Sequence, residues 1–251
     1  MIIITLYDIF VEEMMKKIVI LTGAGVSKES GLDTFRDANG IWAKYSMEEV
    51  CTPEGFKRNP QKLHEFYNKL RNDLSNVQPN AAHIALAELE KAIEQKKMDA
   101  ELIIITQNID DLHERAGSKK LYHMHGELYK LWCRGCDAKI KWQHDCFIDT
   151  PCPHCGQHKL RPDIVWFGEM PYDMDEIQSA LLSCDLFVSI GTSGVVYPAA
   201  GFVQMASSGH AKTVELNLEP SAGTTCFNES KLGPATQLVP QFVDQVLKDE
   251  I

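Results

Sequence analysis

The sequence predicts an α/β protein in which a doubly wound parallel sheet is interrupted by a small inserted metal-binding module. Short runs of β-branched and other apolar residues, alternating with amphipathic helices, are typical of buried parallel strands. Polar residues directly follow several of these runs, at the strand ends where open α/β sheets bind ligands. Two closely spaced pairs of cysteines predict the module.

Composition and charge indicate an ordinary globular protein. The chain has 251 residues, 44% hydrophobic and 24% charged, and a formal net charge of −10 at pH 7. This charge argues against a general nucleic-acid binder, because neutralising phosphates needs clustered basic residues. It would attract a basic, lysine-bearing partner. We therefore expect no direct binding of nucleic acid.

The first ten residues are apolar enough to raise the question of a signal peptide. They lack a basic leading segment and a small-residue cleavage site. No stretch approaches the ~18 apolar residues of a membrane span. These features predict a cytoplasmic protein. The 8 cysteines would contradict this only as a disulfide framework, and four of them instead have the spacing of a metal site.

The first predicted strand, residues 17–22, leads into a glycine-rich stretch, residues 23–27. A strand followed by Gly-x-Gly lets the backbone approach a pyrophosphate at the N-terminus of a helix. Lys28 replaces the third small residue of the dinucleotide fingerprint, which disfavours a plain dehydrogenase. The following turn-rich residues, 30–37, are typical of a lid over a cofactor.

Two amphipathic helices are predicted next, over residues 60–74 and from residue 79 to about 97. The apolar face of the first helix contains five residues: Leu63, Phe66, Tyr67, Leu70 and Leu74. Without further context, Tyr67 is interpreted as a core residue whose hydroxyl is hydrogen-bonded.

The strand over residues 102–105 is the centre of the predicted site. Three polar residues follow it at once: Gln107, Asn108 and Asp110. A second short run, residues 121–124, brings His125 to what we expect to be the same edge of the sheet. Each residue alone could be a turn residue or a buried histidine without a role. Together they indicate a functional site in a strand-end crevice.

Two Cys-x-x-Cys pairs, 15 residues apart, follow the histidine: Cys133, Cys136, Cys152 and Cys155. Two such pairs complete a tetrahedral zinc site of the zinc-ribbon kind, whereas a redox dithiol needs only one. Four thiolates leave no open coordination position, so the zinc should be structural. Cys146 or a nearby histidine could replace a ligand. The module is expected over residues 127–160, inserted into a Rossmann-like domain of residues 14–126 and 161–251.

Residues 161–169 form a short apolar segment after the module. The segment could pair with an extended peptide, or it could be an ordinary crossover into the sheet. Two later strands end in small or polar residues that should reach the same crevice: Gly191, Thr192, Ser193, Asn217 and Glu219. A closing helix is predicted from about residue 239 to 248.

The motifs now described stand in one order along the chain: residues 23–27, 31–36, 106–110, 125–126, the two cysteine pairs, 165–168, 191–193 and 217–219. In this order they resemble the sirtuins, the NAD-dependent protein-lysine deacylases. The resemblance covers about residues 17–248. The amino-acid sequence of residues 50–56, 66–68 and 191–200 is most similar to that of bacterial enzymes of the class that also contains the desuccinylases.

The resemblance implies that NAD is consumed, with release of nicotinamide and O-acyl-ADP-ribose. It implies that His125 deprotonates a ribose hydroxyl as a general base, with Asn108 and Asp110 as further catalytic residues. The residues that it implies for NAD binding are Gly23, Ala24, Gly25, Ser27, Thr34, Phe35, Arg36, Gln107, Asn108, Ile109, Asp110, Gly191, Thr192, Ser193, Asn217, Leu218, Glu219 and Ala235.

The resemblance also implies acyl-lysine proteins or peptides as substrates, bound as an extended strand, and we expect the protein to be a monomer. The residues implied for substrate binding are Tyr67, Leu70, Arg71, Val165, Trp166, Phe167 and Gly168.

The acyl group is expected to be acetyl rather than succinyl or malonyl. The desuccinylase pattern is Tyr-x-x-Arg with a small alanine upstream, and these places hold Tyr67, Leu70 and Cys51. Arg71 stands one position late and would approach a carboxylate from the wrong flank of the helix. Two alternatives remain, a mono-ADP-ribosyltransferase at the same site and a catalytically silent NAD-gated binding module, and the presence of His125 disfavours the second.

Overall fold

The computed structural model describes residues 16–34, 40–248 and 250. Phe35 and Arg36 of the predicted lid, and the apolar N-terminal residues, lie outside these ranges. None of the helices that the structure describes has the length and apolarity needed to span a bilayer.

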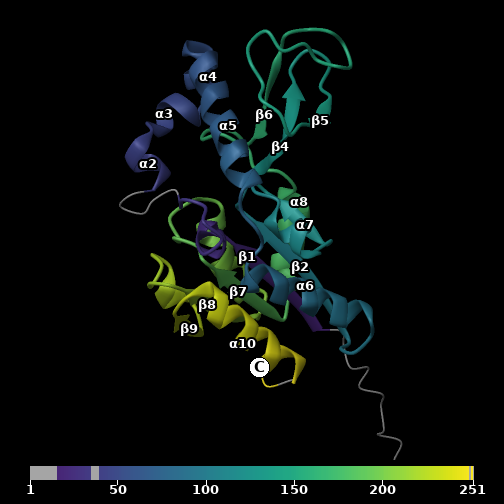
Figure 1. Ribbon diagram of the computed structural model, residues 1–251. Helices are drawn as coiled ribbons and strands as arrows, with labels where there is room; N and C mark the ends of the chain where they lie inside the picture. Colours follow the sequence, from purple (N-terminus) through teal and green to yellow (C-terminus); the bar gives the residue numbers. More distant parts are fainter. Residues whose placement is uncertain (1–15, 35–39, 249, 251) are drawn as a thin grey trace, which may run out of the picture.

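The larger of two sheets has six parallel strands in the order β3-β2-β1-β7-β8-β9 (Figure 1). Strands β1, β2 and β3 form one half of the sheet, and β7, β8 and β9 form the other half, so that β1 and β7 are neighbours at its centre. The crevice between the ends of β1 and β7 is therefore a topological switch point. The strands are β1 (Lys16–Thr22), β2 (Ala100–Thr106), β3 (Leu121–His123), β7 (Leu186–Ile190), β8 (Lys212–Asn217) and β9 (Glu229–Leu232).

Helices cover both faces of this sheet, because its central strands are apolar on both faces. On one face α6 (Ala81–Glu94) and α10 (Ala235–Leu247) share a core with β1, β2, β7 and β8. On the other face α8 (Met174–Leu182) and α9 (Phe202–Ser208) pack against β1, β2 and β7. The predicted doubly wound parallel sheet is confirmed. The shorter elements are α1 (Ala24–Lys28), α7 (Leu112–Ala116), η1 (Ala199–Gly201) and η2 (Thr224–Cys226).

The closing helix α10 begins four residues before its predicted start at residue 239. A first-turn N–H group of a helix needs a partner, and here the Glu29 carboxylate accepts bonds from the Thr236 N–H at 3.0 Å and its hydroxyl at 2.7 Å. This cap comes from a distant part of the chain, so the local sequence does not reveal it.

A smaller antiparallel sheet, in the order β5-β4-β6, forms the other end of the molecule (Figure 1). Its strands are β4 (Gly126–Cys133), β5 (Lys139–Lys141) and β6 (Leu160–Ile164). The predicted helix over residues 60–74 is α5 (Pro60–Ser75), which packs against β4 and β6. Three short helices precede α5: α2 (Ile41–Lys44), α3 (Met47–Val50) and α4 (Pro53–Arg58). These helices and the sheet share an apolar core that includes Phe66, Leu128 and Trp166.

Candidate functional site

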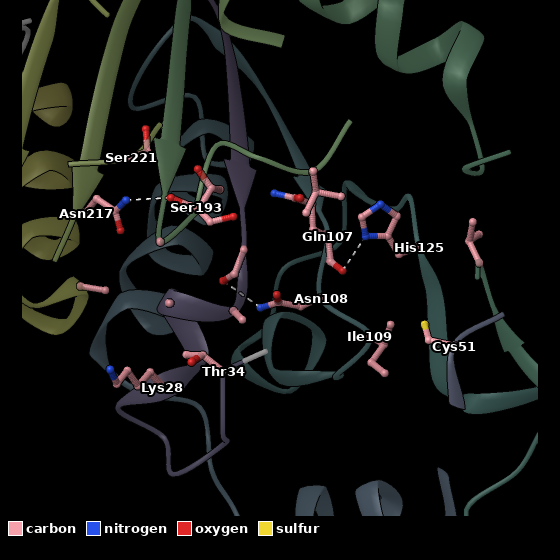
Figure 2. A pocket seen from close by; sticks show the side chains of 18 of the residues that line it. Lys28, Thr34, Cys51, Gln107, Asn108, Ile109, His125, Ser193, Asn217 and Ser221 are labelled. Carbon is pink, nitrogen blue, oxygen red and sulfur yellow. Dashed lines mark hydrogen bonds between the residues drawn. The ribbon is translucent and has the colours of Figure 1, made fainter. Parts of the chain in front are cut away.

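One cavity of about 780 Å³ extends from the strand ends of the large sheet to the helices of the smaller end (Figure 2). The ends of β1, β2, β7 and β8 supply its polar half, and α5 and the segment after β6 supply an apolar half. The cavity thus lies at the predicted strand-end crevice and joins it to a second, apolar compartment.

Two glycine-rich turns meet at the base of the polar half. The Gly25 N–H donates to the Gly191 carbonyl at 2.9 Å, and the Gly23 N–H donates to the carbonyl at the end of β7 at 3.0 Å. A Cβ atom at Gly25 would lie 2.7 Å from the Gly191 Cα, and Gly191 has a positive φ of 63°. Glycine is therefore required here for close contact between two backbones, and both Gly25 and Gly191 line the cavity.

His125 faces the cavity with its orientation fixed from behind (Figure 2). Its Nδ1 atom lies 3.0 Å from the Gln107 carbonyl oxygen. A carbonyl only accepts hydrogen bonds, so Nδ1 carries the proton and Nε2 is the basic nitrogen. Burial of the ring lowers the pKa of His125 below 6.5, against the opposing effect of this hydrogen bond. The imidazole is therefore neutral at pH 7.

Asn108 is held at the cavity wall by a buried polar network. Its Nδ2 group donates to the Gly23 carbonyl and to the Ser27 hydroxyl, both at 3.1 Å. The Ser27 hydroxyl in turn donates to Asp110 at 3.0 Å. Burial raises the pKa of Asp110 to about 6, while hydrogen bonds from Leu112 and Ser27 oppose the rise. Asp110 and Ser27 lie behind Asn108 rather than on the cavity surface.

The remaining predicted NAD residues that the structure describes line the cavity: Gly23, Ala24, Thr34, Ile109, Thr192, Ser193, Asn217, Leu218, Glu219 and Ala235. The Asn217 side chain donates to the Thr192 carbonyl at 2.7 Å, which ties the end of β8 to the loop after β7. Sequence reasoning missed several other lining residues, among them Glu29, Tyr197, Ser221 and Pro234. Ser221 could have been found, since it follows the end of β8 closely.

The apolar half contains Tyr67 and Leu70 from α5, with Cys51 and Trp166 beside them. The Trp166 Nε1–H donates to the Tyr67 hydroxyl at 3.0 Å, and that hydroxyl lies 3.8 Å from the Cys51 sulfur. The expectation of a buried Tyr67 with a hydrogen-bonded hydroxyl is confirmed, and the residue lines the cavity as well.

Arg71 lies outside the cavity. Its guanidinium is buried and donates to the Leu128 carbonyl at 3.0 Å and to Asn68 at 2.7 Å. The side chain therefore points into the junction between α5 and β4, as the turn of the helix requires. Leu70, one position earlier, takes the place on the cavity wall.

Residues 165–168 lie on the cavity wall directly after β6, which ends at Ile164. The Val165 N–H donates to the His125 carbonyl at 2.9 Å, and the Phe167 N–H donates to the Cys51 carbonyl at 3.0 Å. In the part of the chain that the structure describes, no hydrogen bond ends on the carbonyl oxygens of Val165 and Phe167. This segment can therefore accept hydrogen bonds from a peptide main chain.

The four cysteines of the two pairs form one cluster, with all four sulfur atoms within 4.8 Å of one another. Such a set of thiolates fits a structural zinc ion. The Gly135 N–H donates to the Cys133 sulfur at 3.4 Å, as is usual in a metal-binding knuckle. Cys146 is buried in the same apolar core as Cys133 and Cys152, but its sulfur is directed at the Phe147 carbonyl and does not belong to the set of four. The alternative in which Cys146 replaces a ligand is therefore not supported by the geometry.

Comparison with known proteins identifies the family. The Sir2 family model matches residues 23–198. The NAD-dependent protein deacylase of Pasteurella multocida is 54% identical over 234 residues, covering 92% of this chain and 98% of the relative. The corresponding protein of Leishmania major is 53% identical over 238 residues, covering 93% and 97%.

Solved structures give the same result. A mutant Sir2 homologue in complex with ADP-ribose has a TM-score of 0.86 at 36% identity, and the match covers 94% of this chain and 93% of that one. A Sir2 protein bound to a myristoylated histone peptide has a TM-score of 0.71 at 31% identity, with 94% of each chain covered. The order of motifs, the cavity at the switch point and these matches lead to one conclusion: the chain belongs to the Sir2 family.

Proposed function

We propose that this NAD-dependent protein deacylase works as a lysine deacetylase, releasing nicotinamide and O-acetyl-ADP-ribose. The observation that carries the proposal is the position of His125 in a cavity with a polar half and an apolar half. The polar half would hold NAD between the ends of β1, β2, β7 and β8. The apolar half would hold the aliphatic stem and acetyl group of a lysine side chain, which brings the acyl oxygen to the ribose carbon.

His125 and Asn108 would do the proton chemistry of the reaction. Because the Nδ1–H of His125 is bonded to the Gln107 carbonyl, Nε2 can take a proton from a ribose hydroxyl. Both protons of the Asn108 amide nitrogen are used by Gly23 and Ser27, which leaves its Oδ1 atom to accept a hydrogen bond from the ribose. Asp110 and Ser27 would keep this amide in position.

Residues 165–168 would bind the substrate peptide by strand addition. Their carbonyl oxygens at positions 165 and 167 alternate as in a strand edge, and the N–H groups of the same residues are bonded inward. A peptide lying along this segment would gain main-chain hydrogen bonds that do not depend on its sequence. Structures of Sir2 relatives hold peptides, among them a myristoylated histone peptide.

The zinc ion would have a structural role in a module over residues 127–160, inserted between residues 14–126 and 161–251. Four thiolates complete the tetrahedral coordination of zinc and leave no position for a substrate. The ion would hold the loops between β4, β5 and β6 together.

The acyl selectivity follows from the wall beside Tyr67. Leu70 and Cys51 stand there, and Arg71 is bonded elsewhere. A carboxylate at the end of a succinyl chain would lose its hydration against these apolar groups without gaining a guanidinium partner. We propose robust deacetylation and weaker removal of succinyl and malonyl groups.

A panel of acyl peptides of identical sequence tests this proposal. We expect a higher kcat/KM for acetyl than for succinyl or malonyl in the wild type. Leu70→Arg should raise desuccinylation because it places a cation on the cavity wall, whereas Leu70→Met, which stays apolar, should not. A wild-type preference for succinyl over acetyl would contradict the proposed selectivity.

A further inference from the structure

A partly buried ion pair flanks the segment over residues 165–168, which we name the peptide shelf. Arg161 in β6 precedes the shelf and Glu169 follows it. The guanidinium binds both carboxylate oxygens, with Nη1–Oε1 at 2.7 Å and Nη2–Oε2 at 2.9 Å. The Arg161 side chain is 4% exposed and that of Glu169 is 28% exposed. A bidentate pair of this kind fixes direction as well as distance.

Within the described part of the chain, the four side-chain hydrogen bonds of Arg161 end on residues 162–169. Besides the carboxylate, its Nε donates to the Pro162 carbonyl at 3.2 Å and its Nη2 to the Ile164 carbonyl at 2.6 Å. The guanidinium also stacks on the Trp166 ring, 3.4 Å from the ring centroid. Among the described residues, these hydrogen bonds therefore end on β6 itself and on the segment that follows it. The guanidinium also lies 5.3 Å from the centroid of the Trp132 ring in β4.

Glu169 also accepts a main-chain hydrogen bond from the shelf. Its Oε2 atom accepts the Trp166 N–H at 2.9 Å. The neighbouring N–H groups of Val165 and Phe167 are bonded to the main-chain carbonyls of His125 and Cys51. Three consecutive N–H groups are thus bonded inward, and only the middle one depends on a side chain. The Trp166 carbonyl accepts the Glu169 N–H at 2.9 Å, so the carbonyls of Val165 and Phe167 are the ones left for a partner among the described residues.

Stability of the fold is a weak reason for such a pair. Burying two charges costs desolvation that their attraction often only balances. Pre-organising a binding segment has a different benefit, because less conformational freedom is lost when the ligand binds. The contacts of Arg161 and Glu169 match this second role, since they order the few residues that would meet the peptide.

We propose that the Arg161–Glu169 ion pair is a positioning device that holds the peptide shelf ready for the main chain of the substrate. This inference rests on the proposed function, in which the shelf binds the peptide. Arg161 does not line the cavity, so it would act only through the shelf. Glu169 lines the cavity edge, which makes a variant of each partner necessary.

The test is steady-state kinetics of Arg161→Lys and Glu169→Gln with an acetyl-lysine peptide. Lysine keeps the charge of Arg161 but cannot form the fork, and glutamine keeps an acceptor for the Trp166 N–H but loses the charge. We expect the peptide KM to rise about tenfold in both variants, because a less ordered shelf loses more conformational freedom when the peptide binds, with kcat and the KM for NAD within about twofold of wild type. Glu49→Gln is the matched control. It removes the carboxylate charge from a more exposed ion pair, that of Glu49 with Lys62, in the same half of the molecule.

A second peptide, N-methylated at the two residues that flank the acetyl-lysine, separates positioning from a general structural effect. Methylation removes the main-chain donors, so the wild type should lose affinity, and the two variants should lose much less because their shelf is already disordered. If N-methylation raises the peptide KM of the variants by as large a factor as that of the wild type, the inference is overturned. An unchanged peptide KM in Arg161→Lys would also overturn it. A wild-type protein that deacetylates neither peptide would instead refute the proposed function.

Discussion

In the proposed function the chemistry depends on His125, and the surroundings of this residue suit it to act as a base. The Gln107 carbonyl selects the tautomer and burial keeps the ring neutral at pH 7. Loss of a general base commonly lowers turnover by ~10²-fold or more. We expect this loss of kcat in His125→Ala, with NAD binding retained in calorimetry. His144→Ala, at an exposed position, should behave as wild type, and deacetylation by His125→Ala within a few-fold of wild type would refute the assignment.

The pH profile reports on the same group. The neutral imidazole is the active form, so activity should rise with pH through the pKa of His125 and become level above it. Burial lowers this pKa below 6.5, which places the acid limb of kcat/KM below pH 6.5. Asp110, with a pKa of about 6, could titrate in the same range. The limb should therefore persist in Asp110→Asn, and an acid limb centred above pH 6.5 would contradict the neutral base.

Individual site residues could be predicted from the sequence where a motif stands at the end of a buried strand. His125, Asn108 and Gly25 were found in this way, and the structure brings them to one cavity. Whether a residue lies on the cavity wall or behind it was harder to predict. Asp110 lies behind Asn108, and Glu29 reaches the cavity from the end of α1, because both placements depend on packing between distant segments.

Helix α5 connects the loops around the zinc cluster to the cavity through Cys146, which packs in one core with the cluster residues Cys133 and Cys152. The Asn68 side chain accepts from the Cys146 N–H at 2.9 Å and donates to its carbonyl at 3.0 Å. The adjacent residue Tyr67 lines the cavity. A change that loosens the zinc-bound loops should therefore reach the acyl pocket through one turn of this helix.

Cys152→Ser tests this connection. Metal binding is coupled to folding in modules of this size, so we expect loss of close to one equivalent of zinc together with soluble expression or deacetylase activity. Zinc content by mass spectrometry and activity of the same sample provide the measurement. Cys226→Ser, at an exposed cysteine outside the cluster, should change neither. A Cys152→Ser protein with full zinc content and stability would show that another residue completes the site.

Elements with a clear period were predictable, and short ones were not. Helices α5 and α6 follow from the spacing of their apolar residues, and the predicted ranges match within a few residues. Helices α2, α3 and α4 have four to six residues each, too few to show a period. The early start of α10 depends on Glu29, which no local pattern reveals.

At the scale of the whole molecule, the fold positions two compartments around one histidine. The switch point between β1 and β7 supplies the polar compartment, and α5 with the segment after β6 lines the apolar one. The smaller sheet and α2–α5 lie together at one end of the molecule (Figure 1). The sheet class and the cysteine cluster were predictable because each has a strong local signature. The packing of α5 on β4 and β6, which builds the apolar compartment, was not, since it depends on contacts between residues far apart in the chain.

The stoichiometry of products tests the central claim most directly. The purified protein would be incubated with NAD and an acetyl-lysine peptide, and the products quantified by mass spectrometry. We expect nicotinamide, deacetylated peptide and O-acetyl-ADP-ribose in equal amounts, because one cavity holds both substrates and the acetyl group moves to the ribose. Nicotinamide released together with ADP-ribosylated protein, while the peptide keeps its acetyl group, would contradict the claim and identify a mono-ADP-ribosyltransferase.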